Sequence, residues 1–101
     1  MTRLSYFIGL CFGILFIYPF SIQAQSKKLL KAAETGNIIS QYELGIFYIS
    51  SKKQYNPEKA VKWLTKSAEQ GYDLAQYQLG YMYFVSGKYD EATKWTKAAA
   101  L

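Results

Sequence analysis

The sequence predicts an all-α protein in which antiparallel helix pairs, or αα-hairpins, stack as a repeat solenoid. The first observation is internal repetition: residues 31–51 and 66–86 share 10 of 21 identities at an offset of 35 positions. A self-match with a period of about 20–50 residues is typical of repeat architectures. The second observation is that no segment alternates apolar and polar residues for long enough to form a convincing strand. We expect about two repeats preceded by a leading half-hairpin.

The N-terminal segment has the pattern of a secretory signal peptide. Residues 4–26 carry no charge, Arg3 precedes them, and Pro19 interrupts the apolar run. A basic start, an apolar middle and a small residue before a polar stretch favour cleavage between Ala24 and Gln25. We therefore expect a leader over residues 1–24, a repeat domain over residues 25–101, and a periplasmic or secreted protein. An uncleaved membrane anchor is the alternative, because about 20 apolar residues span a bilayer.

Three helices are expected in the first part of the repeat domain. The first covers residues 27–35 and ends before Gly36, which suits the left-handed residue after a helix. The second covers about 38–51, with Asn37 as its N-cap. After a polar loop, Asn56 and Pro57 open the third helix, which ends at Gly71.

Two further helices complete the chain. Asp73 is expected to cap the fourth, over about 74–86, and a short loop around Gly87 follows. Asp90 and Glu91 open the fifth helix, where their charges complement the helix dipole. The fifth helix runs to the end of the sequence.

Small residues at matching repeat positions predict how the helices pack. Gly45 and Gly80 lie inside helices, where glycine costs about 1 kcal/mol relative to alanine, so we expect each to permit a close helix approach. Ala60 and Ala92 would be their small partners on the facing helices. The full set of expected repeat-packing residues is Leu44, Gly45, Tyr48, Ala60, Trp63, Ala68, Gly71, Ala75, Leu79, Gly80, Tyr83, Ala92 and Trp95.

Several of these residues form a pattern that resembles the Sel-one-like repeat, a relative of the tetratricopeptide repeat. The resemblance covers about residues 27–101 and is carried by Ala75, Leu79, Gly80 and Tyr83, and by Ala60, Trp63, Lys66, Ala68, Glu69 and Gly71. It implies a right-handed superhelix of helix pairs with a concave groove that holds a protein or peptide. It also implies an adaptor or regulator, and many bacterial members are exported to the cell envelope.

The residue inventory argues against most catalytic chemistry. The chain has no histidine, and its single cysteine, Cys11, lies in the apolar leader. Nucleophile–base catalysis and the usual zinc sites are therefore not expected, nor is a cofactor. The net charge of +5 comes from dispersed lysines, so no nucleic-acid partner is expected either. We expect a non-enzymatic, protein-binding chain. The alternatives are a hydrolase acting on cell-wall material or a β-lactam, and a truncated remnant of a longer repeat protein.

Candidate binding residues lie on the first helix of each repeat, which is apolar nearly all round. Packing between neighbouring repeats is one explanation of that pattern. The other is an exposed groove for a partner, with Tyr42, Tyr77, Tyr81 and Phe84 as apolar contacts and Gln41 and Gln76 as polar ones. The C-terminal helix ends in Ala98–Leu101 without a polar cap, so self-association through this helix is a further expectation.

Overall fold

The computed structural model describes residues 24–101, so the predicted leader lies outside the described residues except for Ala24. A leading helix covers residues 24–34 and is followed by α2 (Ile38–Ser50), α3 (Pro57–Glu69), α4 (Asp73–Val85) and α5 (Tyr89–Ala100). No strand occurs within these residues. None of the helices described here is long and apolar enough to cross a membrane.

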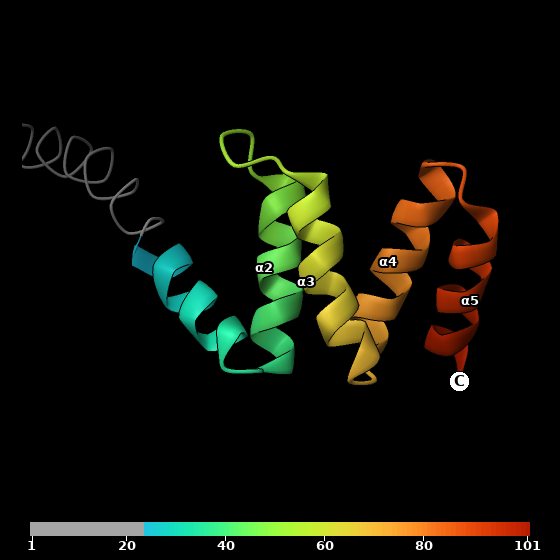
Figure 1. The fold of residues 1–101 in the computed structure, drawn as a ribbon, viewed down its shortest axis with the longest axis horizontal. Coiled ribbons are helices and arrows are strands. Elements are labelled where there is room, and N and C mark those ends of the chain that lie inside the picture. The colour runs from blue at the N-terminus through green and yellow to red at the C-terminus, as the bar shows by residue number, and fades with distance from the viewer. Residues whose placement is uncertain (1–23) are drawn as a thin grey trace, which may run out of the picture.

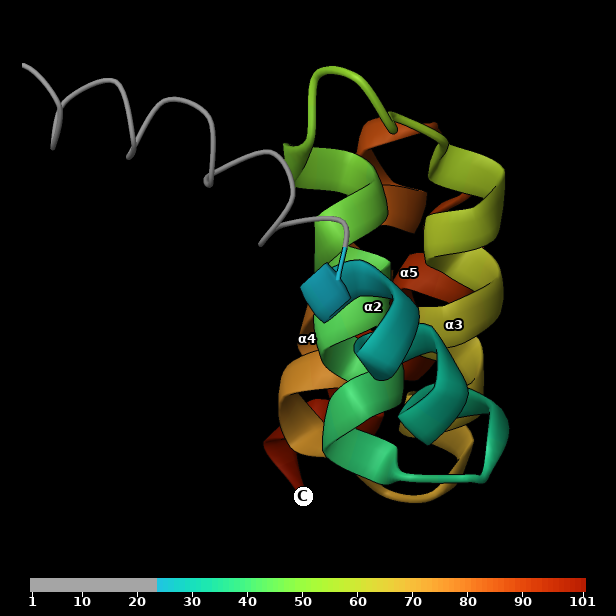
Figure 2. The same ribbon diagram turned by 90° about the vertical axis from the view of Figure 1, so that its left-hand side faces the viewer.

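The helices stand side by side in chain order, and their connections alternate between the two ends of the molecule (Figure 1). Two hairpins result, α2 with α3 and α4 with α5, and α3 packs against α4 between them. The leading helix lies over the first hairpin on the side away from α4 (Figure 2). This arrangement is the predicted stack of helical hairpins.

Glycines end three of the helices in the predicted way. Gly36, Gly71 and Gly87 have φ angles of 97°, 91° and 81°. This left-handed region carries a steric cost for residues with a Cβ atom, which explains glycine at each of these turns. At these three turns the chain reversal therefore depends on local sequence.

Asparagines begin two helices as predicted. The Asn37 side chain accepts a hydrogen bond from the Ser40 backbone N–H at 2.9 Å, and Asn56 accepts one from Lys59 at 3.1 Å. Each bond satisfies an N–H group that has no partner within the helix. These two caps set the starts of α2 and α3.

The prediction that Asp73 caps α4 is wrong by one position. Asp73 is the first helical residue, and Tyr72 occupies the N-cap position without a side-chain cap bond. The Asp73 carboxylate instead accepts from the backbone N–H of Leu74 at 2.9 Å. Tyr72 is the repeat equivalent of Asn37, which caps α2, so both helices begin at the same repeat position. The Tyr72 ring packs edge-on against Tyr42, with ring centroids 5.2 Å apart.

The core consists of two clusters, one on each side of the first hairpin. The inter-hairpin cluster contains Leu64, Ala68, Ala75 and Leu79, and joins α3 to α4. The leading cluster contains Ala33, Leu44 and Trp63, against which residues of the leading helix and of α2 pack: Leu29, Leu30, Phe47 and Tyr48. The first hairpin is therefore covered on both sides.

The two helical glycines lie at close contacts between the helices of each hairpin. A Cβ atom built at Gly45 would lie 2.6 Å from Leu64 Cγ. One at Gly80 would lie 2.7 Å from Thr96 Oγ1 and 3.3 Å from the Ala92 carbonyl oxygen. The distances of 2.6 and 2.7 Å are too short for a carbon atom, so the close approach predicted from the repeated glycine is present in both hairpins.

Candidate protein-binding surfaces

Gln41 and Gln76 make the same hydrogen bond one repeat apart. The Gln41 side-chain amide donates to the Ala33 carbonyl oxygen at 3.1 Å, and that of Gln76 donates to Ala68 at 3.1 Å. Gln41 is only 4% exposed, and its oxygen accepts from Gln70 at 2.7 Å. These amides join α2 and α4 each to the helix before it. The burial of Gln41 corrects its assignment as a polar contact for a partner, whereas that of the half-buried Gln76 stays a prediction. Their matching positions eight residues after an alanine were the available sequence signal.

The tyrosines predicted to contact a partner fall into two environments. Tyr42 is half-buried and packs against the inter-hairpin cluster, where α4 covers it. Its repeat equivalent Tyr77 is 62% exposed. Tyr42 therefore serves packing between neighbouring repeats, which was the alternative explanation, whereas Tyr77 lies on an open surface.

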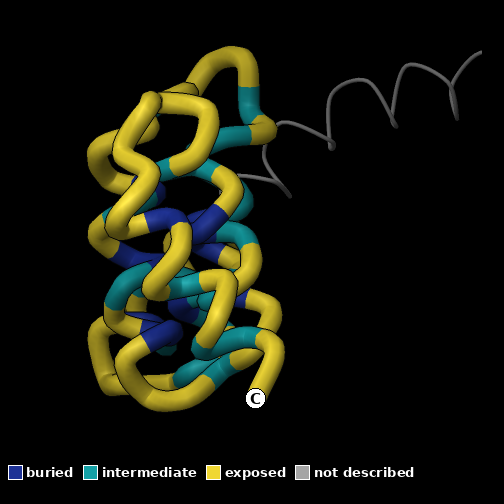
Figure 3. The backbone as a smooth tube through the Cα atoms, turned by 90° about the vertical axis from the view of Figure 1, so that its right-hand side faces the viewer, coloured by how far each residue is buried: buried dark blue, intermediate teal, exposed yellow. Residues whose placement is uncertain are grey.

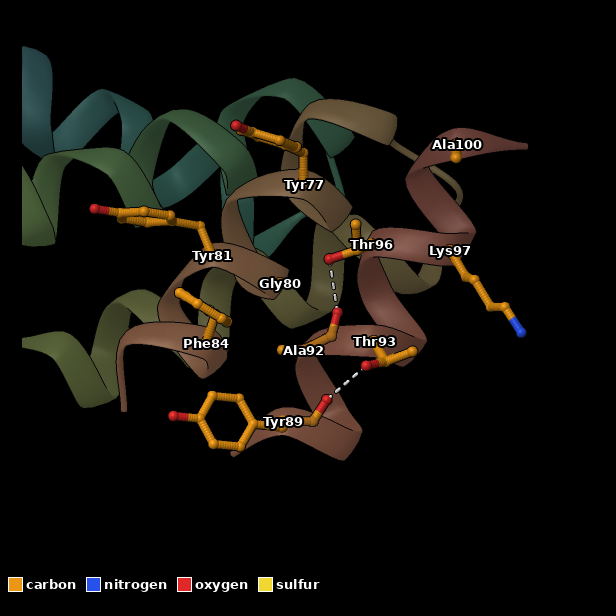
Figure 4. A pocket seen from close by; sticks show the side chains of 10 residues that line it. All are labelled: Tyr77, Gly80, Tyr81, Phe84, Tyr89, Ala92, Thr93, Thr96, Lys97 and Ala100. Atoms are coloured by element: carbon orange, nitrogen blue, oxygen red, sulfur yellow. Dashed lines mark hydrogen bonds between the residues drawn. The ribbon is translucent and has the colours of Figure 1, made fainter. Parts of the chain in front are cut away.

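The open surface on the second hairpin is defined here as the α4–α5 face. It is a groove of about 530 Å³. Tyr77, Tyr81 and Phe84 line its α4 side, each about 60% exposed (Figure 4). Figure 3, which looks at the α5 side, shows mostly exposed positions along this end of the molecule. The other lining residues are Gly80, Tyr89, Ala92, Thr93, Thr96, Lys97 and Ala100.

The two threonine hydroxyls in this groove are already engaged within α5. The Thr93 hydroxyl donates to the Tyr89 carbonyl oxygen at 2.8 Å, and the Thr96 hydroxyl donates to Ala92 at 2.7 Å (Figure 4). Neither hydroxyl needs a new partner when apolar groups cover it. The α4–α5 face is therefore suited to an apolar occupant.

A second groove lies between the two hairpins near the α2–α3 and α4–α5 loops, and is called the junction groove. It has a volume of about 650 Å³, and Tyr81 is its one lining residue that the sequence predicted to contact a partner. Its sequence signal was weak, because loop and helix-end residues supply much of it. The lining residues are Ile49, Tyr55, Pro57, Glu58, Val61, Gln78, Tyr81, Met82, Tyr83, Val85, Ser86 and Lys88.

Residues suited to metal binding are not grouped in the described part of the chain. Within residues 24–101 no three or more histidine, cysteine, aspartate or glutamate side chains gather in a way that could hold a metal ion. Asp90 and Glu91 lie in the first turn of α5, where they complement the helix dipole.

Comparison with known protein families matches residues 38–72 and 73–101 to the Sel1 repeat. The chain belongs to the Sel1 repeat family. The two matched units are the two hairpins seen in the structure, and the leading helix precedes the first. Sel1 repeats generally mediate protein–protein interactions and are typically non-catalytic scaffolds. Searches of curated proteins and of solved structures found no significant match.

Proposed function

We propose that this Sel1-repeat chain is an exported, non-catalytic scaffold of the bacterial cell envelope that binds a protein or peptide in the junction groove. The observation that carries the proposal is the groove itself, which is built where the two repeats meet. Both first helices contribute to it, Ile49 from α2 and Gln78, Tyr81 and Val85 from α4.

The chemistry of the junction groove suits a peptide. Tyr55, Tyr81 and Val85 are about 60% exposed and offer large apolar contacts. Glu58 and Lys88, of opposite charge, are among the exposed lining residues and can orient a backbone or a charged side chain. An apolar surface with a few placed polar groups is the usual composition of a binding site.

Export is tested by the intact mass of the protein recovered from the periplasm of a bacterial host. We expect the mass of Gln25–Leu101, because the uncharged segment after Arg3 ends at a small residue suited to cleavage. Cleavage there would remove only Ala24 from the described part of the leading helix. The full-length mass in the membrane fraction would contradict export with cleavage and favour an anchored scaffold.

Partner binding is tested by a photo-crosslinking amino acid placed at Tyr55 in the expressed protein. We expect a discrete crosslinked protein that disappears when Val85→Lys adds a charge to the same groove. The same crosslinker at Thr35, an exposed turn residue outside both grooves, is the control. Identical crosslinks from Tyr55 and Thr35, or crosslinks insensitive to Val85→Lys, would contradict the proposal.

A further inference from the structure

We propose that two copies of this chain associate through their α4–α5 faces, about a two-fold axis that runs along the helices. In this arrangement α4 of each copy lies antiparallel on α5 of the other. The junction groove remains the proposed site for a different protein, and the two surfaces share only Tyr81 among their lining residues.

The first argument is the internal repeat, which shows what kind of element covers this face. At an offset of 32 positions, Val61, Leu64 and Ala68 of α3 correspond to Thr93, Thr96 and Ala100 of α5. α4 packs on these α3 residues of the first hairpin, and Ala75 and Leu79 of α4 are fully buried in that contact. Within the described residues no helix covers the corresponding α5 positions, and Thr93 and Thr96 are exposed.

The second argument compares the two first helices of the repeats. Both are apolar nearly all round, a pattern typical of helices covered on several sides. α2 meets this expectation, because the leading cluster covers one side and the inter-hairpin cluster the other. α4 is covered on its Leu79 side, while Tyr77, Tyr81 and Phe84 remain about 60% exposed.

The third argument is that the α4–α5 face is complementary to itself in shape. Its α4 side carries the rings of Tyr77, Tyr81 and Phe84, whereas its α5 side carries the small residues Thr96 and Ala100. The one ring on the α5 side, Tyr89, packs edge-on against Phe84 of the same copy. A two-fold axis along the helices places the rings of one copy over the small residues of the other, on both halves at once. Such an interface closes with two copies and does not propagate into a filament.

The fourth argument is charge. Asp73 lies four residues before Tyr77 and so continues the same stripe of α4, while Lys97 lies in the last turn of α5. Lys97 extends away from the rings of its own copy (Figure 4). The antiparallel arrangement brings the start of α4 in one copy near the end of α5 in the other. Each dimer would then contain two Asp73–Lys97 contacts between opposite charges at its rim.

Sedimentation equilibrium of the protein expressed from the full sequence tests the dimer. We expect a dimer at micromolar concentration and a monomer for Tyr77→Lys, because lysine at an exposed ring position leaves the fold intact but opposes the apolar contact. Val85→Lys, an exposed α4 residue of the junction groove, is the matched control and should stay dimeric. A native monomer at all concentrations, a dimeric Tyr77→Lys, or a monomeric Val85→Lys would overturn the proposal.

A charge exchange tests the orientation of the two copies. Lys97→Glu alone and Asp73→Lys alone should each weaken the dimer by about tenfold, since like charges meet twice in each homodimer. Mixing the two variants should restore native affinity, because both contacts in the mixed dimer again join opposite charges. If the mixed dimer has the same dissociation constant as the dimers of each variant alone, the proposed orientation is wrong.

The two proposals can fail separately. If the chain is monomeric but still gives crosslinks at Tyr55 that depend on Val85, the scaffold proposal stands and the dimer proposal is refuted. If the chain forms a dimer that depends on Tyr77 but gives no such crosslinks, the dimer proposal stands and the proposal of a partner in the junction groove is refuted. Crosslinking of a different protein to Tyr77 in a monomeric chain would assign the α4–α5 face to that protein instead.

Discussion

At the scale of single residues, the glutamines show how one side chain can connect neighbouring helices. Gln41 bonds to Ala33 and accepts from Gln70, so it links the leading helix, α2 and the residue that ends α3. Gln76 repeats the bond to the preceding helix through Ala68. Buried amides of this kind stabilise the fold mainly because leaving their partners unsatisfied is costly.

Replacing Gln41 with methionine, which has a similar shape, should lower the free energy of unfolding by about 1–3 kcal/mol. The loss leaves the Ala33 carbonyl and the Gln70 amide without this partner. Thermal melting followed by circular dichroism measures the effect as a fall in Tm. Gln54→Met, at an exposed loop position, is the control. An equal Tm for both variants would show that the buried amide contributes nothing.

At the scale of elements, packing explains glycine in the interior of two helices. Alanine or leucine would form a better isolated helix, but the facing helix lies too close to Gly45 and Gly80 for a Cβ atom. Each of these glycines therefore marks a point where the two helices of a hairpin lie unusually close together. The Asp73 position shows the limit of such local arguments, because α4 begins at the same repeat position as α2 although Tyr72 offers no side-chain cap.

Gly80→Leu should destabilise the protein by about 1–3 kcal/mol, although leucine has the higher helix propensity. The added side chain would collide with Thr96 and the backbone of α5, and would separate the two helices of the second hairpin. Tyr81→Leu changes the neighbouring, exposed residue and should leave the monomer's Tm nearly unchanged. A helical melt unaffected by Gly80→Leu would refute the close-approach argument.

At the scale of the whole molecule, the two repeats are alike in sequence but unlike in surroundings. The leading helix and α4 cover the first hairpin on its two sides, so Leu44 and Trp63 are only 1% and 5% exposed. The second hairpin has α3 on one side and the open α4–α5 face on the other. Stability in a stack of repeats depends on such neighbour contacts.

Leu30→Asp should detach the leading helix and lower the free energy of unfolding by about 1.5–3 kcal/mol, since Leu30 packs against the leading cluster. In a Trp95→Phe background, fluorescence reports on Trp63 alone, and its emission should shift to longer wavelength as the ring meets water. Lys31→Asp introduces the same side chain at the adjacent exposed position and should leave the emission in place. Equal emission for the two variants would show that the leading helix does not shield Trp63.

Helix boundaries and the repeat could be predicted from the sequence because their causes are local. Asn56 with Pro57 starts a helix and Gly71 ends one wherever they occur, and repeated Gly45 and Gly80 predict close contacts. The candidate site was predicted only in part. Tyr77, Tyr81 and Phe84 were named, but so was Gln41, whose buried amide serves the fold. Most of the junction groove was missed, because no local pattern unites its residues.

The sequence by itself determined an all-helical Sel1-repeat chain, because caps, glycines and apolar spacing act over a few residues. Only the tertiary structure decided which copy of the apolar stripe remains exposed. Tyr42 and Tyr77 occupy the same repeat position, yet α4 covers the first and no described helix covers the second. The exposure of a side chain depends on what packs over it, and that neighbour can come from anywhere in the chain.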